Sequence, residues 1–354
     1  MPKYGCLRNL WVIMPVFIAL AFLLIILTTT MFLNNNSYFG TTNNLVYGQS
    51  DLMNSNVTNS LNIQNIPVKR VHVGDIDIAY KVFGKGDPIL LISAFGAPMD
   101  GWEPSTLREL SSNHTVIIFD NRGVGNTTTG TKPFSIQQFA NDTAGLLDGL
   151  KIQKADVLGF SMGSFVAQQL TVTHPEKVNR LILYGASCGG KEGISPSPEV
   201  IKLTKKHVNS IVSNTPIEPQ EVKTIVSLGF GPTWIKLHPN FLETIPTASN
   251  LKDLILSGIT PNAYMQQFNA VLNWYATNWS GVCSQLPNIS KPTLVITGTE
   301  DVSVPAANSL IIAAKIPGAW LVQIQAAGHE LMSQHPDKFN KVLQTFLATT
   351  ISPN

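Results

Sequence analysis

Charged residues are scarce in this chain of 354 residues, where Asp, Glu, Lys and Arg together account for 13% of the positions. An average soluble protein has about 25%. The net charge is only +2, so the composition gives no general electrostatic attraction to a polyanion, and we expect no nucleic-acid partner. Part of the deficit lies in one long uncharged segment near the N-terminus.

Cysteine is also rare, with three residues in all, which are too few for a disulfide framework. Cys188 and Cys283 flank a segment of helical pattern, and two interpretations of them remain open. They form a disulfide, or they are two unpaired small hydrophobic residues. No cluster of His, Cys, Asp and Glu has the spacing of metal ligands, so we expect no metal and no other cofactor.

Residues 10–33 contain no charged side chain and are almost continuously apolar. As a helix they would be about 36 Å long, enough to cross the roughly 30 Å hydrocarbon core of a bilayer. The alternatives are a helix buried in a soluble domain, which is rarely this long at an N-terminus, and a cleaved signal peptide. A signal peptide has an apolar region of about 7–15 residues followed by a small-residue cleavage site, and this run has neither feature. We predict a transmembrane signal-anchor helix.

The charges around this run indicate its orientation. Lys3 and Arg8 precede it, and no Lys or Arg follows it until Lys69. Because positive residues favour the cytoplasmic side of a span, residues 1–9 are expected in the cytoplasm and the rest of the chain outside it, attached to the cell membrane by a single pass. If the run is instead cleaved, the protein is secreted. Residues 34–65, rich in Asn, Ser and Thr, predict a disordered tether.

From residue 66 onward, strand and helix patterns alternate along the chain. The first two strands flank the turn dipeptide Gly74-Asp75, which predicts a hairpin. The alternation predicts an α/β fold whose mainly parallel sheet is covered by helices on both faces. The expected strands are 71–73, 76–80, 89–93, 115–119, 155–160, 181–184, 293–298 and 320–324, and helices are expected at 136–150 and 162–173.

Between residues 188 and 290 the strand patterns give way to helical segments separated by Pro and Gly. We interpret this stretch as a helical cap inserted into an α/β domain that spans residues 66–354. The cap is rich in aromatic side chains, most of which are expected to pack it, while a few would line an apolar substrate pocket. The aromatic residues of the cap are Trp234, Tyr264, Phe268, Trp274, Tyr275 and Trp279.

Residues 159–163 read Gly-Phe-Ser-Met-Gly, which is the pattern G-x-S-x-G. They follow an apolar strand and open a helix, the context in which this pattern forms a nucleophile elbow. The sharp turn holds the serine in a strained conformation, and only small flanking residues leave room for it. Ser161 is therefore predicted to be a nucleophile at the positive end of the following helix.

A serine hydroxyl is a weak nucleophile until an imidazole removes its proton, and a carboxylate orients that imidazole. The predicted strand 293–298 is followed by Thr-Glu-Asp, so Glu300 and Asp301 are both candidates for the acid. His329 follows the last predicted strand and is the candidate base. The other six histidines lie at helix ends or outside this loop.

The order Ser161, Asp301, His329 resembles that of the α/β-hydrolase superfamily. The resemblance covers residues 66–348 and is closest to the serine hydrolase branch that holds small esterases, lactonases and haloperoxidase-like enzymes. It implies an α/β-hydrolase fold with an inserted cap. It also selects Asp301 over Glu300, because the family places its acid at the second of these two positions.

Two further loops carry the resemblance. Asp120-Asn-Arg122-Gly-Val-Gly matches the family's D-x-R-G-x-G loop, and the match implies that Asp120 and Arg122 shape this loop rather than take part in catalysis. The family usually has His-Gly after the third strand, whereas this chain has Ser-Ala at 93–94. The backbone N–H groups of Phe95 and Met162 are the expected oxyanion hole, since backbone donors survive side-chain changes.

These features together predict a serine hydrolase that cleaves a small ester or lactone through an acyl-enzyme intermediate. The cap has no dense cluster of charge, which favours uncharged small-molecule substrates. Two alternatives remain: a hydrolase of another bond (a thioester, a C–C bond or an N-terminal peptide bond), and a non-catalytic binding protein or receptor that keeps the pocket. The expected partners are the small-molecule substrate and the membrane.

Overall fold

The computed structural model describes residues 63–245, 255, 258–279 and 281–349. The expected anchor at 10–33 and nearly all of the expected tether lie outside these residues. The last three residues of the tether, Ile63–Asn65, form a short 3-10 helix. Within the described ranges, no helix is both long enough and apolar enough to cross a membrane.

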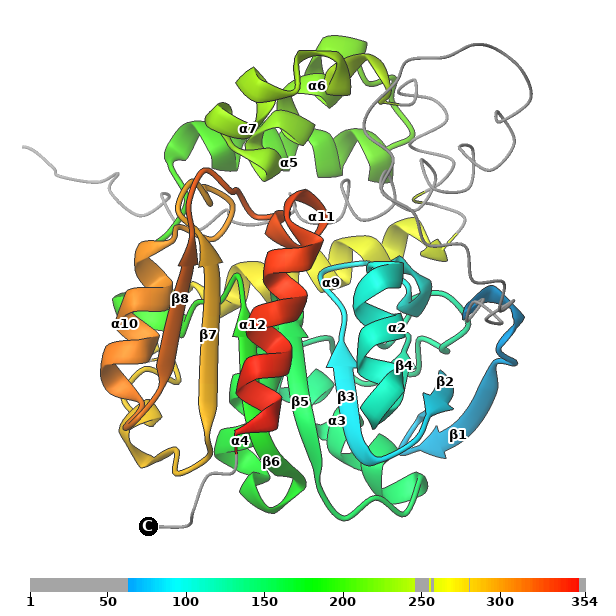
Figure 1. The fold of residues 1–354 in the computed structure, drawn as a ribbon. Coiled ribbons are helices and arrows are strands. Elements are labelled where there is room, and N and C mark those ends of the chain that lie inside the picture. The colour runs from blue at the N-terminus through cyan, green and yellow to red at the C-terminus, as the bar shows by residue number, and fades with distance from the viewer. Residues whose placement is uncertain (1–62, 246–254, 256–257, 280, 350–354) are drawn as a thin grey trace, which may run out of the picture.

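One sheet holds the eight strands β1 (Lys69–Val73), β2 (Ile76–Gly84), β3 (Asp87–Ile92), β4 (His114–Phe119), β5 (Ala155–Phe160), β6 (Val178–Tyr184), β7 (Thr293–Gly298) and β8 (Trp320–Ile324). Their order across the sheet is β1-β2-β4-β3-β5-β6-β7-β8 (Figure 1). β2 pairs antiparallel with β1 and β4, and every other neighbouring pair is parallel. The prediction of an α/β fold with a mainly parallel sheet is therefore confirmed.

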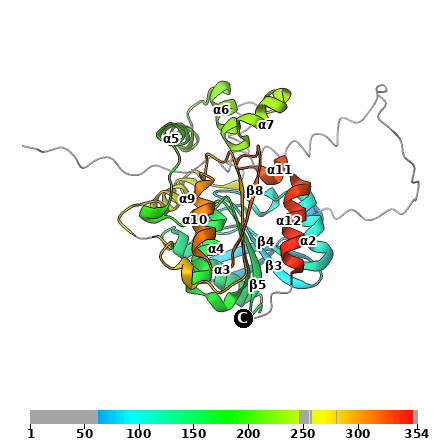
Figure 2. The ribbon, with the colours of Figure 1, turned by 60° about the vertical axis from the view of Figure 1, so that its left-hand side comes forward.

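Helices cover both faces of the sheet. They are α2 (Pro104–Asn113), α3 (Ile136–Gly149), α4 (Met162–Thr173), α10 (Ala307–Lys315) and α12 (Pro336–Ala348). Figure 2 shows α2 and α12 on one face and α3, α4 and α10 on the other. Because both faces are covered, the interior strands β5 and β7 are buried along their whole length, which explains their consecutive apolar residues at 157–158 and 294–296.

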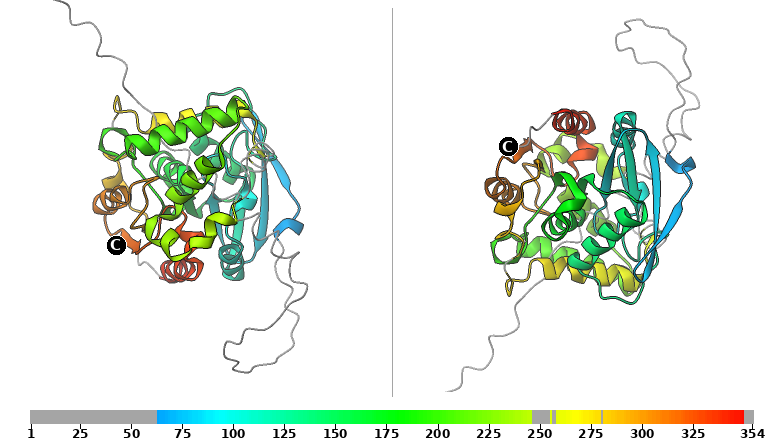
Figure 3. Two further views of the ribbon diagram at one scale, coloured as in Figure 1. Left: turned by 90° about the horizontal axis from the view of Figure 1, so that it is seen from above. Right: turned by 90° about the horizontal axis from the view of Figure 1, so that it is seen from below.

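Among the described residues between β6 and β7 there are four α-helices. They are α5 (Pro198–Val212), α6 (Pro219–Phe230), α7 (Pro232–Leu237) and α9 (Pro261–Trp274). Each begins with proline, whose fixed φ and missing N–H suit the first helical position. In Figures 1 and 3, α5, α6 and α7 lie over the carboxyl ends of the parallel strands, and α9 lies closer to the sheet. The short helix α11 (Leu331–Gln334) follows β8 at the same edge.

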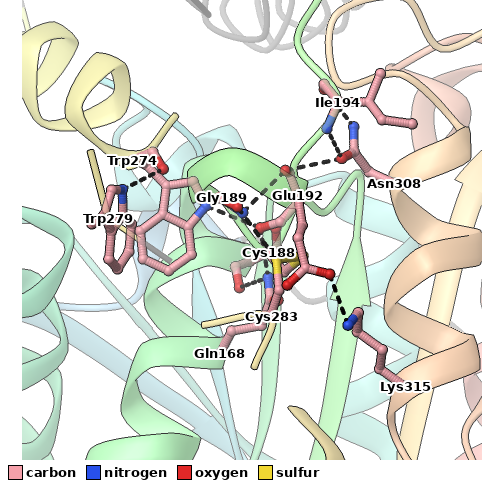
Figure 4. The surroundings of a disulfide bond; sticks show 12 residues. Gln168, Cys188, Gly189, Glu192, Ile194, Trp274, Trp279, Cys283, Asn308 and Lys315 are labelled. Atoms are coloured by element: carbon pink, nitrogen blue, oxygen red, sulfur yellow. Dashed lines mark hydrogen bonds and ion pairs between the residues drawn. A yellow bond between two sulfur atoms is a disulfide. The ribbon is translucent and has the colours of Figure 1, made fainter. Parts of the chain in front are cut away.

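A disulfide joins the two ends of this helical insertion. Cys188 follows β6, Cys283 precedes β7, and their Cα atoms are 5.0 Å apart. The backbone N–H of Val282 donates to the carbonyl of Cys188 at 3.0 Å, and the indole of Trp274 on α9 donates to the carbonyl of Ser187 (Figure 4). Of the two interpretations that the sequence leaves open, the structure therefore has the disulfide.

Candidate active site

Ser161 lies in the turn between β5 and α4, with φ 53° and ψ −119°. A non-glycine residue in this region is strained by about 1–3 kcal/mol, and the neighbouring elements maintain the conformation. Ser161 N–H donates to the carbonyl of Tyr184 on β6 at 2.9 Å. A Cβ atom at Gly163 would lie 1.9 Å from the carbonyl oxygen of Ile92, so only glycine allows α4 to approach β3 this closely. The prediction of a sharp strand–turn–helix at this motif is confirmed.

His329 and Asp301 meet at the carboxyl ends of β7 and β8. His329 Nδ1 lies 2.7 Å from Asp301 Oδ2, and both side chains are fully buried. The other carboxylate oxygen of Asp301 accepts hydrogen bonds from the backbone N–H groups of Ser303 and Val304, at 2.9 and 2.8 Å. A carboxylate held in this way fixes both the position and the tautomer of the imidazole.

Ser161 Oγ and His329 Nε2 are both buried, and neither has a hydrogen-bond partner among the described residues. The two residues belong to one cluster, because Phe160, which directly precedes Ser161 in the chain, has its ring 5.1 Å from the ring of His329. Tyr184 connects them further, since its hydroxyl donates to the carbonyl of His329 while its own carbonyl accepts from Ser161. Without substrate, catalytic hydrogen bonds are often long or poorly aligned, and they shorten when the substrate binds.

The two expected oxyanion donors lie at the start of α4 and in the turn after β3, two segments that approach each other closely at Gly163. Met162 is the first residue of α4, so its N–H is one of the helix amides that have no acceptor within the helix. Phe95 lies in the turn that follows β3, where Ala97 N–H donates to the carbonyl of Ala94 at 3.1 Å. The Phe95 ring packs 4.6 Å from the ring of Tyr264 on α9.

Asp120 and Arg122 have structural contacts, as the resemblance implied. Asp120 accepts hydrogen bonds from the backbone N–H groups of Met99 and Asn126, and its burial raises the pKa of Asp120 to about 6. The guanidinium of Arg122 is buried between Asp75 and Asp142, at 2.8 and 2.7 Å. Hydrogen bonds from Arg122 hold the pKa of Asp75 well below its ordinary value.

Glu300, the alternative acid, points away from His329. Its carboxylate accepts hydrogen bonds from the backbone N–H (2.9 Å) and the hydroxyl of Thr233, at the first turn of cap helix α7. Negative charge at a helix N-terminus is stabilising. The residue therefore holds the cap to the loop that carries Asp301.

Glu330, next to His329, is a buried carboxyl group that the sequence did not single out. It is fully buried, and neither of its side-chain oxygens has a hydrogen-bond partner among the described residues. Burial, together with the negative charge of Asp301, raises the pKa of Glu330 well above its usual range. The surroundings of Glu330 therefore favour its neutral form over its charged form.

The cap aromatics are mainly packing residues, as expected. Trp234 packs against Phe230 within the cap, with ring centroids 4.7 Å apart. Trp274 stacks on Phe165 of α4 at 5.5 Å. Within the described residues, no group of three or more His, Cys, Asp and Glu could hold a metal ion.

Comparison with known proteins places the chain among hydrolases. A sequence model of the family described as alpha/beta hydrolase fold matches residues 87–336, well over half of the chain. A putative carbamate hydrolase, RutD of Azorhizobium caulinodans, is 27% identical over 279 residues, covering 78% of this chain and 96% of that protein. A putative non-heme bromoperoxidase, BpoC of Mycobacterium tuberculosis, is 28% identical over 287 residues, covering 77% and 98%.

Solved structures give a similar result. Est816, described as an N-acyl homoserine lactone degrading enzyme, superposes with a TM-score of 0.63 at 25% sequence identity. The match covers 78% of this chain and all of that one.

Proposed function

The chain belongs to the alpha/beta hydrolase fold family, and within it we propose a serine hydrolase that cleaves a small ester or lactone. The observation that carries the proposal is the fully buried pair of His329 and Asp301, 2.7 Å apart, in one cluster with an elbow serine. A buried histidine oriented by a carboxylate is the base that a serine nucleophile requires.

The proposed reaction begins when Ser161 Oγ attacks the carbonyl carbon and His329 Nε2 accepts the serine proton. Asp301 stabilises the imidazolium, and the N–H groups of Phe95 and Met162 bind the oxyanion. His329 then protonates the departing alcohol, which leaves an acyl group on Ser161. Water attacks this ester with His329 as the base, and the acid is released while Ser161 regains its proton.

The first test is turnover of aryl esters of increasing acyl length, and of several lactones, by the full-length protein. Ser161→Ala should lower kcat by at least three orders of magnitude, because a triad nucleophile is lost. Binding of a fluorophosphonate to the wild type but not to the variant would identify the nucleophile independently of the substrate. Full esterase activity in the folded variant would rule the proposal out.

Two other outcomes of this assay would favour the alternatives. Labelling of Ser161 without turnover of esters or lactones would favour another bond type, and carbamates are the next substrates to test because of the name of one relative. Neither labelling nor turnover would favour a binding protein that has kept the hydrolase pocket.

We also propose that the catalytic domain lies outside the cytoplasm, attached to the cell membrane by residues 10–33. The distribution of positive charge supports this orientation, and so does the Cys188–Cys283 disulfide, since disulfides persist mainly in oxidising compartments. A reporter fused after Asn354 should be accessible from outside intact cells. Protection of the reporter would contradict the orientation, and its release into the medium would favour a cleaved signal peptide.

A further inference from the structure

The turn that carries the expected oxyanion donor Phe95 is hydrogen-bonded to a side chain of the cap. Gly96 N–H donates to Gln267 Oε1 on α9 at 2.7 Å, and Gln267 Nε2 donates to the carbonyl of Arg122 at 3.0 Å. Gln267 is fully buried. We propose that Gln267 is a positioning residue that orients the oxyanion loop, an inference that rests on the function proposed above.

The turn contains two peptides that are fixed by different hydrogen bonds: the Ala94–Phe95 peptide, which carries the donor, and the Phe95–Gly96 peptide, which Gln267 binds. Gly96 has φ +63°, whereas Phe95 has no positive φ, and Ala97 N–H closes the turn on the carbonyl of Ala94. A four-residue turn with positive φ only at its third residue is of type II. Since C=O and N–H point in opposite directions in a trans peptide, the inward carbonyl of Ala94 directs the N–H of Phe95 out of the turn.

The peptide between Phe95 and Gly96 is the part of this turn that can change. Type I and type II turns differ by a reversal of this central peptide, and only one orientation directs Gly96 N–H at Gln267 Oε1. The amide of Gln267 therefore selects the type II turn. Since ψ of the second turn residue differs by about 150° between the two types, the same bond fixes the backbone of Phe95, and the donor N–H is held through that residue. Packing of the Phe95 ring against Tyr264 and Phe268 restrains the side chain, whereas the bond to Gln267 restrains the peptide.

Gln267 also connects the oxyanion loop to the loop of Arg122, because its two ends bind one backbone group in each. This hydrogen bond is of interest because the chain lacks the His-Gly that the family usually has after the third strand. The loop has Ser-Ala at 93–94 instead, and a residue 171 positions away accepts the hydrogen bond that fixes Gly96.

The test compares Gln267→Leu with a matched control, Asn340→Leu. Asn340 is a buried amide that accepts from the hydroxyl of Thr106 between α12 and α2, away from the cap. Loss of a complete oxyanion donor costs about 10²–10³ in kcat, so a displaced donor should cost about 10- to 100-fold. We expect that loss in Gln267→Leu with KM changed less than about threefold, whereas Asn340→Leu should lose stability but keep its kcat.

Two readouts separate positioning from a general loss of structure. The affinity of an arylboronic acid, which forms a tetrahedral adduct on serine, should weaken in Gln267→Leu by the same factor as kcat. Amide hydrogen exchange in the peptide that covers residues 93–97 should become faster in that variant alone. If Gln267→Leu does not fold, Gln267→Asn is used in its place. Its side chain is one methylene shorter, so the amide no longer reaches Gly96.

Unchanged kcat and boronate affinity in a folded Gln267 variant would overturn the inference. An equal loss of kcat in Asn340→Leu would overturn it as well. If the wild type turns over no ester or lactone, the proposed function fails, and hydrogen exchange alone then decides whether Gln267 braces the loop: faster exchange at 93–97 supports the brace, and unchanged exchange refutes it.

Discussion

Glu300 and Asp301 are adjacent carboxylates whose side chains point to different partners. Asp301 Oδ2 lies 2.7 Å from His329, while Glu300 binds the first turn of α7 through Thr233. The sequence alone left both as candidates for the acid, and only the resemblance to a family separated them. Their surroundings differ because the side chain of Glu300 extends toward the cap, whereas that of Asp301 is buried in the core.

The two carboxylates should respond differently to removal of their charge. Asp301→Asn should lower kcat by about 10³–10⁴, since an uncharged partner neither fixes the tautomer nor stabilises the imidazolium. Glu300→Gln should change kcat by less than about tenfold and should act mainly on cap stability. Steady-state kinetics and thermal unfolding of both variants test this expectation, and an equal fall in kcat would contradict it.

His207, on α5 in the cap, is a buried imidazole with no hydrogen bond to either nitrogen from the described residues. Glu221 Oε1 lies 4.0 Å from its Nδ1, which is too far for a hydrogen bond. Burial lowers the pKa of His207 to about 4, from an ordinary value of 6.5. The unfolded chain therefore binds a proton between these values while the folded chain does not, and stability is lost as the pH falls from 6.5 to 4.

Replacement of His207 by phenylalanine should remove this loss. The free energy of unfolding of His207→Phe, relative to the wild type, should increase by up to about 3 kcal/mol between pH 6.5 and pH 4. Denaturant unfolding at both pH values measures the difference. A constant difference across this range would show that His207 does not titrate as its burial implies.

Asp120 acts in the opposite direction over an overlapping range. Its pKa is raised from 3.8 to about 6, so its contribution to stability is present below pH 3.8 and is lost as the pH rises through 6. The wild-type stability should consequently vary less with pH than either group alone would suggest. For this reason the prediction for His207 concerns the difference in unfolding free energy between His207→Phe and the wild type, and not the pH dependence of the wild type alone.

At the scale of secondary structure, Arg122 joins elements that are not neighbours in the chain. Its guanidinium binds Asp75, in the turn between β1 and β2, and Asp142 on α3. Arg122→Lys keeps the charge but loses the planar fork that binds two carboxylates at once. We expect the variant to lose about 3 kcal/mol of stability, within the range found when buried ion pairs are broken.

Chemical denaturation measures this loss. Arg180→Lys is a matched control, because Arg180 binds a single carboxylate, that of Asp156, through one hydrogen bond of 3.0 Å that a lysine can also make. It should lose less than about 1 kcal/mol, the order of one hydrogen bond. Equal losses in the two variants would refute the argument.

Sequence patterns predicted three of the parallel strands well. The expected ranges 155–160, 293–298 and 320–324 match β5, β7 and β8 to the residue, because each is a short run of strand-forming residues between turn signals. β2 was expected to end at residue 80 but continues to Gly84. Residues 81–84 pair with β4, and this pairing across the sheet has no local sequence signal.

For the site, too, some residues could be predicted from the sequence and others could not. The elbow serine and the loops after β7 and β8 were visible because they follow strands whose ends meet at one edge of the sheet. Gln267 was not visible, since a single glutamine in an amphipathic helix has no pattern that indicates its partners. Its role follows only from the packing of α9 against the turn at Gly96.

At the scale of the whole molecule, the helical insertion contacts three of the loops that carry candidate catalytic groups. Gln267 binds the turn of Gly96, Thr233 binds Glu300 beside the acid, and Gln334 Nε2, after the base, donates to the carbonyl of Phe230. These hydrogen bonds join the cap to the core at the edge of the sheet over which α5, α6 and α7 lie in Figure 1. Substitutions inside the cap are expected to affect kcat as well as substrate affinity.

The disulfide between Cys188 and Cys283 has a consequence for cleavage of the chain. It joins two residues that are 95 positions apart, so the chain between them forms a covalent ring that the disulfide closes. A protease that cuts one peptide bond inside the ring should leave two fragments that migrate together on a denaturing gel, and they should separate after reduction. Fragments that separate without reductant would show that the disulfide is absent in solution. With the disulfide formed, a single cut inside the ring releases no part of the chain.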